Sequence, residues 1–207
     1  MHENDKINNP DNAYPVRKPT RLPDYDYSQN GCYFVTICTA NKEPLFGRYL
    51  VGALHEAPVI KMPCNRFIAL NRRGVITKKI LYSLPKRFPQ IQIENTIIMP
   101  NHIHLLLTID WERGKWERAL REAPLQRSLL AQAIGYFKAN TSKELHKTEP
   151  NLQVWQRGFY EHILRNETEF FRAWEYIEYN ALKEYGKRNK YRKIIKELYE
   201  HKKIKRT

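Results

Sequence analysis

Cysteines and long apolar runs are what this sequence most lacks. Its 207 residues include three cysteines, Cys32, Cys38 and Cys64, and no two of them have CxxC spacing. This excludes a disulfide framework and favours the reducing cytoplasm. No run of about eighteen apolar residues occurs, which excludes a membrane-spanning helix. The N-terminus is polar and lacks the apolar core of a signal peptide. We therefore expect a cytoplasmic protein with no membrane contact.

Acidic residues are scarce relative to basic ones. The chain has 22 Asp and Glu against 36 Lys and Arg, a net charge of +14 and a pI of about 9.7. Such a surplus favours a polyanionic partner, nucleic acid above all, although a basic protein can also be merely soluble. Aromatic residues make up 12% of the chain, and unpaired bases stack on aromatic side chains.

The pattern divides the chain into three parts. Residues 1–30 are rich in proline, lack periodicity, and are predicted to form an extended basic and aromatic arm. Arg17, Lys18 and Arg21 lie there among tyrosines and are candidate nucleic-acid contacts, although a solubilising tail would look the same. Residues 31–185 are predicted to form one domain. Residues 186–207 show apolar residues at helical spacing among lysines and arginines and predict a basic C-terminal helix.

The central part alternates strand-like and helix-like segments. Strands are expected at 31–39, at 91–109 as a hairpin, and at 154–164 with a break at Gly158; helices are expected at 67–84, 125–147 and from Asn166 to about Lys183. The order strand, helix, strand, strand, helix, strand predicts an α+β, ferredoxin-like split βαβ fold with a central antiparallel sheet. Helices would cover one sheet face, and we expect the other face to be open.

The hairpin carries two histidines. Pro100-Asn101 is a turn dipeptide between apolar runs, and His102 and His104 follow it in the second strand. Side chains alternate along a strand, so both imidazoles point to the same, open face. Two neutral imidazoles can form half of a metal site, although a His-x-His in an apolar strand is more often structural.

The helix after Asn166 has two faces. Asn166 is a good N-cap, with Glu169 at the capping-box position. Phe170, Trp174, Ile177 and Ala181 fall on one apolar stripe; the residues gathered roughly opposite are Arg172, Tyr176, Asn180 and Lys183. Tyr176 is thus expected on the side away from the buried stripe, one turn before Asn180. An ordinary surface tyrosine would fit the same pattern.

Two distant motifs carry a resemblance. Met-Pro-Asn-His-Ile-His-Leu-Leu-Leu at 99–107 resembles the His-hydrophobic-His motif of single-tyrosine HUH transposases. The segment 154–167, from Val-Trp-Gln-Arg-Gly-Phe-Tyr onward, and Tyr-Ile-Glu-Tyr-Asn at 176–180 resemble the REP-associated tyrosine transposases. The similarity covers roughly residues 16–185. That family commonly has Asn-Pro after the tyrosine helix, where this chain has Asn180-Ala181.

The resemblance implies a site and a chemistry. It implies that Tyr176 is the catalytic nucleophile of a C-terminal catalytic helix, and that His102, His104 and Asn180 bind a divalent metal, Mg²⁺ or Mn²⁺. Attack on a phosphodiester would give a 5′-phosphotyrosine link and a free 3′-hydroxyl, which can later be rejoined without a nucleotide cofactor. The DNA contacts are expected from basic residues in or near these segments: Arg17, Lys18, Arg21, Lys138, Arg165, Arg172 and Lys183. His162 is either a proton shuttle or partner of the site or a structural strand histidine.

The favoured function is therefore an enzyme, a DNA transposase or endonuclease. It would cleave and transfer single-stranded or hairpin-forming repeat DNA as a nucleoid-associated monomer or homodimer. The alternative is a non-catalytic single-stranded nucleic-acid-binding module on the same fold, with structural histidines. A replication or conjugation initiator nuclease with HUH chemistry is a third possibility, which the lack of a helicase-sized region disfavours.

Overall fold

A computed structural model describes residues 29–50, 67–114 and 128–188. The predicted arm contacts Arg17, Lys18 and Arg21, and most of the predicted C-terminal helix, lie outside the described residues. The bounds of the described helices and strands are, in chain order, β1 Gly31–Cys38, a 3₁₀ turn Ala40–Lys42, β2 Gly47–Tyr49, β3 Ile68–Leu70, α1 Arg72–Leu81, α2 Leu84–Arg87, β4 Ile91–Ile98, β5 His102–Ile109, a 3₁₀ turn Trp111–Gly114, α3 Leu129–His146, β6 Tyr160–Leu164 and α4 Glu167–Arg188.

A four-stranded antiparallel sheet forms the centre, in the order β4-β5-β1-β6. With β2 and β3 set aside as a separate small sheet, this is the predicted α+β, ferredoxin-like arrangement. The predicted hairpin is confirmed: the amide of Met99 donates to the carbonyl of His102 across Pro100-Asn101. In the described part of the chain, none of the helices has the length and apolarity that crossing a bilayer requires.

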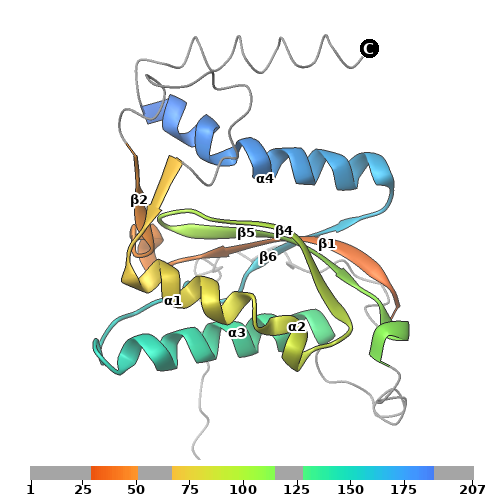
Figure 1. Cartoon of the computed structure of the whole chain (residues 1–207), viewed down its shortest axis with the longest axis horizontal. Helices are drawn as coiled ribbons and strands as arrows, with labels where there is room; N and C mark the ends of the chain where they lie inside the picture. The colour runs from red at the N-terminus through yellow and green to blue at the C-terminus, as the bar shows by residue number, and fades with distance from the viewer. Residues whose placement is uncertain (1–28, 51–66, 115–127, 189–207) are drawn as a thin grey trace, which may run out of the picture.

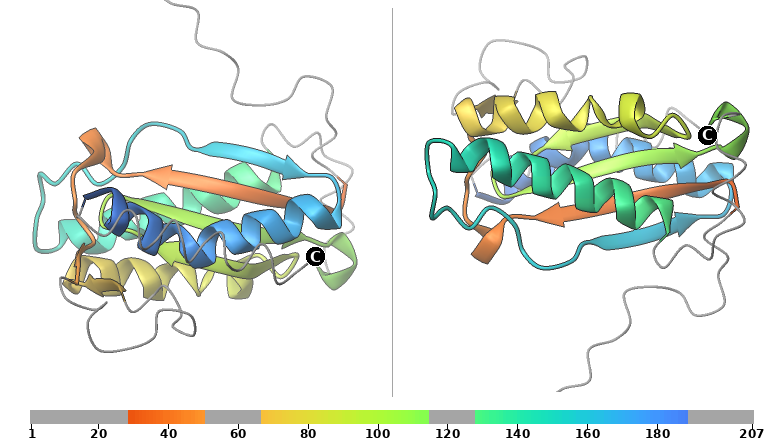
Figure 2. Two further views of the ribbon diagram at one scale, coloured as in Figure 1. Left: turned by 90° about the horizontal axis from the view of Figure 1, so that it is seen from above. Right: turned by 90° about the horizontal axis from the view of Figure 1, so that it is seen from below.

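Each face of the sheet is covered by its own helices. Helices α1, α2 and α3 lie on one side and α4 on the other (Figure 1). Figure 2 shows α4 lying over the strands, roughly along their length, when the sheet is viewed from above, and α1 and α3 side by side when it is viewed from below. Every second residue of β1 and β5, such as Val35 and Leu105, is buried in the larger core between the sheet and α1–α3. The residues between them point to the other face of the sheet, where a smaller core includes Leu106, Ile177 and Ala181.

The expectation of an open histidine face is therefore wrong. His104 belongs to the face under α4 and is only 6% exposed. Helix α4 covers this face because the contact buries the apolar side chains of Ile177 and Ala181 against the sheet. An open face would leave these side chains in water. Replacing His104 by Ala would leave a cavity rather than an empty surface position.

One predicted boundary is also wrong. The segment predicted as a helix from 67 begins instead with β3, which pairs with β2, and the helix starts after Asn71, whose side chain accepts from the amide of Gly74. Gly74 fits there because a Cβ would overlap the carbonyl oxygen of Phe46. The break predicted at Gly158 within the strand segment 154–164 is confirmed. Gly158 has a φ of +76° and separates the isolated bridge between Trp155 and Thr39 from the regular strand β6.

Helix α4 begins as predicted but buries a different set of residues. Asn166 Oδ1 accepts from the amide of Glu169, and the Glu169 carboxylate accepts from the amide of Arg165. The expected apolar stripe is only partly correct, because Trp174 is 37% exposed while Asn180 is 1% exposed beside Ala181. The helix thus turns Asn180 toward the sheet. It continues to Arg188, past the domain boundary predicted at 185.

Candidate active site

The sheet under α4 presents rows of facing side chains. Antiparallel pairing sets Thr36 of β1 opposite His104 of β5, and Tyr160 of β6 opposite Thr36. The neighbouring row has Phe34 between His162 and Leu106. Directly paired residues share a face, so the histidines of β5 and the His162 side of β6 look toward the same helix.

The two predicted metal ligands are adjacent and oriented by hydrogen bonds. The ring centroids of His102 and His104 lie 4.6 Å apart. His102 Nδ1 lies 2.7 Å from Asn101 Oδ1, and His104 Nδ1 lies 2.9 Å from Thr36 Oγ1. The side-chain oxygen Oδ1 of Asn101 can only accept, so His102 donates from Nδ1 and keeps the lone pair on Nε2. The Thr36 hydroxyl can accept from His104 Nδ1 in the same way. This is how metal-binding histidines are commonly oriented in proteins.

Both imidazoles are held in the neutral form. Burial lowers the pKa of His102, and the nearby charge of Glu184 partly opposes that shift. Burial, with a smaller contribution from His102, lowers the pKa of His104 to about 3. A neutral imidazole has a free lone pair, whereas an imidazolium cannot bind a metal.

Tyr176 of α4 lies against His104. Its ring meets the His104 ring edge-on, with centroids 5.2 Å apart, and meets Phe34 in the same way at 5.7 Å. The Nζ of Lys183 lies 5.7 Å from the Tyr176 ring centroid. Tyr176 is nevertheless 38% exposed, so a large substrate can reach it. Tyr179, the other tyrosine of the 176–180 motif, packs instead against the smaller core.

Asn180 is the third predicted ligand, and its environment fits the role. The side chain is 1% exposed, and Oδ1 has no hydrogen-bond partner among the described residues. A buried amide oxygen without a partner is costly unless something binds it. Asn180 lies one turn after Tyr176 and one turn before Glu184, the residue whose charge acts on His102, so it is on the helix face that meets the histidines.

The donor set suits a hard divalent cation. Two imidazole nitrogens and one amide oxygen leave positions for phosphate oxygens and water. Within the described residues no cluster of three or more His, Cys, Asp or Glu side chains is placed to hold a metal, so a site here would depend on the Asn180 oxygen. The neutral imidazoles of His102 and His104 and the unpartnered oxygen of Asn180 are the features that fit such a cation.

The predicted DNA contacts are distributed unevenly. Arg172 and Lys183 lie on α4 near Tyr176, and Arg165 lies at the start of that helix. Lys138 belongs to α3 on the other layer, and its Nζ donates to the carbonyls of Gln156 and Gly158. It fixes the segment before β6, and the structure does not bring it to this site.

Sequence reasoning missed the residues that support the histidines. Thr36 and Phe34 could have been found by pairing the first strand with the hairpin in antiparallel register. Asn101 precedes His102 directly. Glu184 is half-buried and lies one turn beyond Asn180. Extending the predicted helix past Lys183 would have placed Glu184 on the same face as Asn180. His162 is 68% exposed, with Nε2 lying 3.8 Å from Glu169 Oε2.

Comparisons with known proteins give relatives in sequence and in structure. No protein-family model matches the chain. A Haemophilus influenzae protein described as "Uncharacterized protein" is 35% identical over 173 residues, which cover 80% of this chain and 88% of the relative. A second Haemophilus influenzae protein, "Putative REP-associated tyrosine transposase", is 28% identical over 165 residues, covering 76% of this chain and 74% of the relative.

Solved structures also match with low identity. One, "Structure of the REP associates tyrosine transposase bound to a REP hairpin", has a TM-score of 0.45 at 15% identity and covers 74% of this chain and 68% of that chain. Another, described as a "putative transposase" from Deinococcus radiodurans R1, has a TM-score of 0.40 at 14% identity and covers 76% of this chain and 95% of that chain.

Proposed function

The chain belongs to the family of REP-associated tyrosine transposases, and from that premise we propose that Tyr176 cleaves single-stranded DNA through a 5′-phosphotyrosine intermediate. Hairpin-forming repeat DNA is the proposed substrate. One observation carries the proposal: Tyr176 is accessible, its ring contacts His104, and the buried Asn180 oxygen one turn away lacks a partner. A non-catalytic module would have no need of that arrangement.

The cleavage step follows from the position of Tyr176. A tyrosine hydroxyl has a pKa of about 10 and is a weak nucleophile until it is deprotonated or oriented. The Tyr176 oxygen attacks phosphorus and releases its proton to solvent. The bond between phosphorus and the 3′-oxygen breaks, and the leaving oxygen takes a proton from water. The reverse reaction with another 3′-hydroxyl joins strands and restores Tyr176.

The surrounding residues bind and orient the phosphate. His102, His104 and Asn180 would hold a divalent ion, which, when bound, withdraws charge from a non-bridging phosphate oxygen. Lys183 lies beside the Tyr176 ring and can stabilise negative charge on the phenolate or the phosphate. Thr36 and Asn101 keep the two imidazoles oriented. The net charge of +14 favours association with the DNA backbone.

Covalent capture tests this proposal. Single-stranded and hairpin oligonucleotides labelled at either end are mixed with the protein in Mn²⁺, Mg²⁺ or EDTA, and SDS-stable complexes are separated. A 5′-phosphotyrosine link retains the downstream DNA, so only the 3′ label should migrate with the protein, and only with metal.

Tyr176→Phe and Tyr179→Phe form the matched pair. The first should abolish the complex and retain DNA binding, whereas the second should form the complex. Binding without any covalent complex from the unaltered protein would support the alternative of a nucleic-acid-binding module. A complex that carries the 5′ label would contradict the proposed polarity.

A further inference from the structure

A cavity opens beside Tyr176 that the chemistry above does not use. It has a volume of about 430 Å³, within the range of about 300–1,000 Å³ typical of small-molecule sites. Its floor comes from the sheet, with Phe34 on β1 and Leu164 and His162 on β6. Its roof is one face of α4, with Glu169, Ala173 and Tyr176 one helical turn apart.

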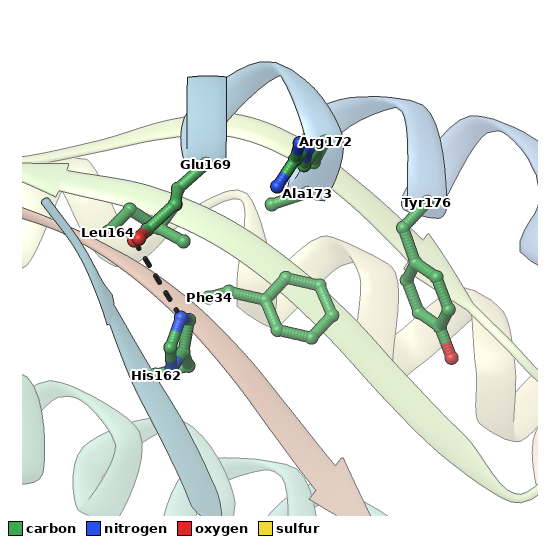
Figure 3. A pocket seen from close by; sticks show the side chains of 7 residues that line it. All are labelled: Phe34, His162, Leu164, Glu169, Arg172, Ala173 and Tyr176. Atoms are coloured by element: carbon green, nitrogen blue, oxygen red, sulfur yellow. Dashed lines mark ion pairs between the residues drawn. The ribbon is translucent and has the colours of Figure 1, made fainter. Parts of the chain in front are cut away.

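The walls of the cavity are flat and apolar. In Figure 3 the Phe34 ring lies between His162 and Tyr176, below Ala173. The ring is fixed in place, because it stacks on His104 with an interplanar angle of 24° and meets Tyr176 edge-on. A fixed aromatic ring beside aliphatic side chains suits the face of a planar heterocycle, such as a nucleobase.

Polar groups also line the cavity. Glu169 Oε2 accepts from the amide of Arg165 and lies 3.8 Å from His162 Nε2 (Figure 3). The carboxylate is thereby fixed and can accept from a ligand N–H. Arg172 also lines the cavity and carries a positive charge that a phosphate would neutralise. Stacking walls, an acceptor and a cation are the groups needed to bind one nucleotide.

We propose that this cavity, called here the base pocket, holds one unstacked nucleobase of a nucleotide that flanks the phosphate attacked by Tyr176. The inference rests on the proposed function, because Tyr176 forms one wall of the pocket. Phe34 stacks on the base, Glu169 accepts from its edge, and Arg172 neutralises its phosphate.

The acceptor in the pocket selects among bases. Cytosine, adenine and guanine carry an amino group that can donate to Glu169. Thymine offers one N–H between two carbonyl oxygens, which would face the carboxylate and repel it. The base pocket therefore favours a base with an amino group over thymine, and a lost hydrogen bond to a charged group lowers affinity about tenfold or more.

Equilibrium binding of homo-oligomers tests this without knowledge of the target sequence. In oligo(dC) or oligo(dT) every binding register places the same base in the pocket. Because the two oligonucleotides have equal length and equal charge, the electrostatic contribution cancels in the ratio of their affinities. The Tyr176→Phe protein is the parent, so that no covalent step intervenes. We expect it to bind oligo(dC) about tenfold more tightly than oligo(dT).

Two substitutions with matched controls assign the preference to the pocket. Glu169→Gln keeps an oxygen that accepts from Arg165 and should reduce the preference at least fivefold. Glu167→Gln, two residues earlier and outside the pocket lining, should leave the preference unchanged. Ala173→Met fills the cavity and should weaken binding of both oligonucleotides about 5- to 150-fold, the range for losing one stacked base. Ala139→Met, exposed on α3, is its control.

Three results would overturn the base pocket: equal affinities of the parent for the two oligonucleotides, equal effects of Glu169→Gln and Glu167→Gln, or no effect of Ala173→Met in a protein with an unchanged far-ultraviolet circular dichroism spectrum. The proposed cleavage is judged separately by covalent capture with Tyr176 intact. A normal covalent complex together with equal affinities would reject the base pocket alone.

Discussion

The buried His104 makes the stability of the metal-free protein depend on pH. Its pKa is about 3 in the folded protein, whereas an imidazole in an unfolded chain has a pKa of about 6.5. Between these values the unfolded chain binds the proton and the folded protein does not. The free energy of unfolding therefore falls as the pH falls below about 6.5, and this contribution is fully lost only below about 3.

The size of the effect follows from the two pKa values. Each pH unit between them removes at most about 1.4 kcal/mol, so lowering the pH from 7 to 5 should remove about 2 kcal/mol through His104 alone. Burial also lowers the pKa of His102, which adds to the loss in the same direction. A loss of this size is a large part of the stability of an ordinary domain.

Urea unfolding in EDTA at pH 7, 6 and 5 measures this loss. His104→Gln can still hydrogen-bond to Thr36 but does not titrate, so its stability should fall about 2 kcal/mol less over the same range. Equal losses in the two proteins would refute the assignment of a buried, neutral His104. A smaller loss in the unaltered protein than in the variant would show that the sign is wrong.

Three further predictions concern the site and the arm. Thr36→Val removes the hydrogen bond to His104 and should lower Mn²⁺ affinity about 10- to 100-fold by calorimetry. In EDTA it should also lower the free energy of unfolding by about 1–3 kcal/mol, because the buried Nδ1 of His104 loses its partner. Asn180→Leu removes a buried oxygen without a partner and should leave the metal-free protein equally or more stable, by up to about 2 kcal/mol in urea, while metal-induced stabilisation disappears; clear destabilisation would mean that the oxygen is satisfied within the protein. Deleting residues 1–22 should flatten the slope of log affinity for DNA against log salt, and an unchanged slope would show that Arg17 and its basic neighbours do not contact phosphate.

The sequence predicted the features that depend on local patterns. The hairpin around Pro100-Asn101, the N-cap Asn166 and the shared face of His102 and His104 follow from turn residues, capping and strand alternation. These features need only neighbours in sequence. The strand order also followed, because the ferredoxin-like pattern leaves few ways to connect four strands.

What the sequence could not predict depends on long-range packing. Residues 67–70 have apolar spacing compatible with a helix, and only their pairing with β2 makes them a strand. Which sheet face the last helix covers is decided by tertiary contacts, so the burial of His104 and Asn180 was missed. The base pocket likewise combines β1, β6 and α4, which no single motif connects.

Peptide mapping of the covalent complex identifies the nucleophile. After trapping with a 3′-labelled oligonucleotide and Mn²⁺, nuclease and protease digestion leaves a nucleotide on one peptide, which mass spectrometry identifies. We expect the phosphonucleotide on Tyr176. A phosphonucleotide on Tyr179, or on any residue outside α4, would contradict it.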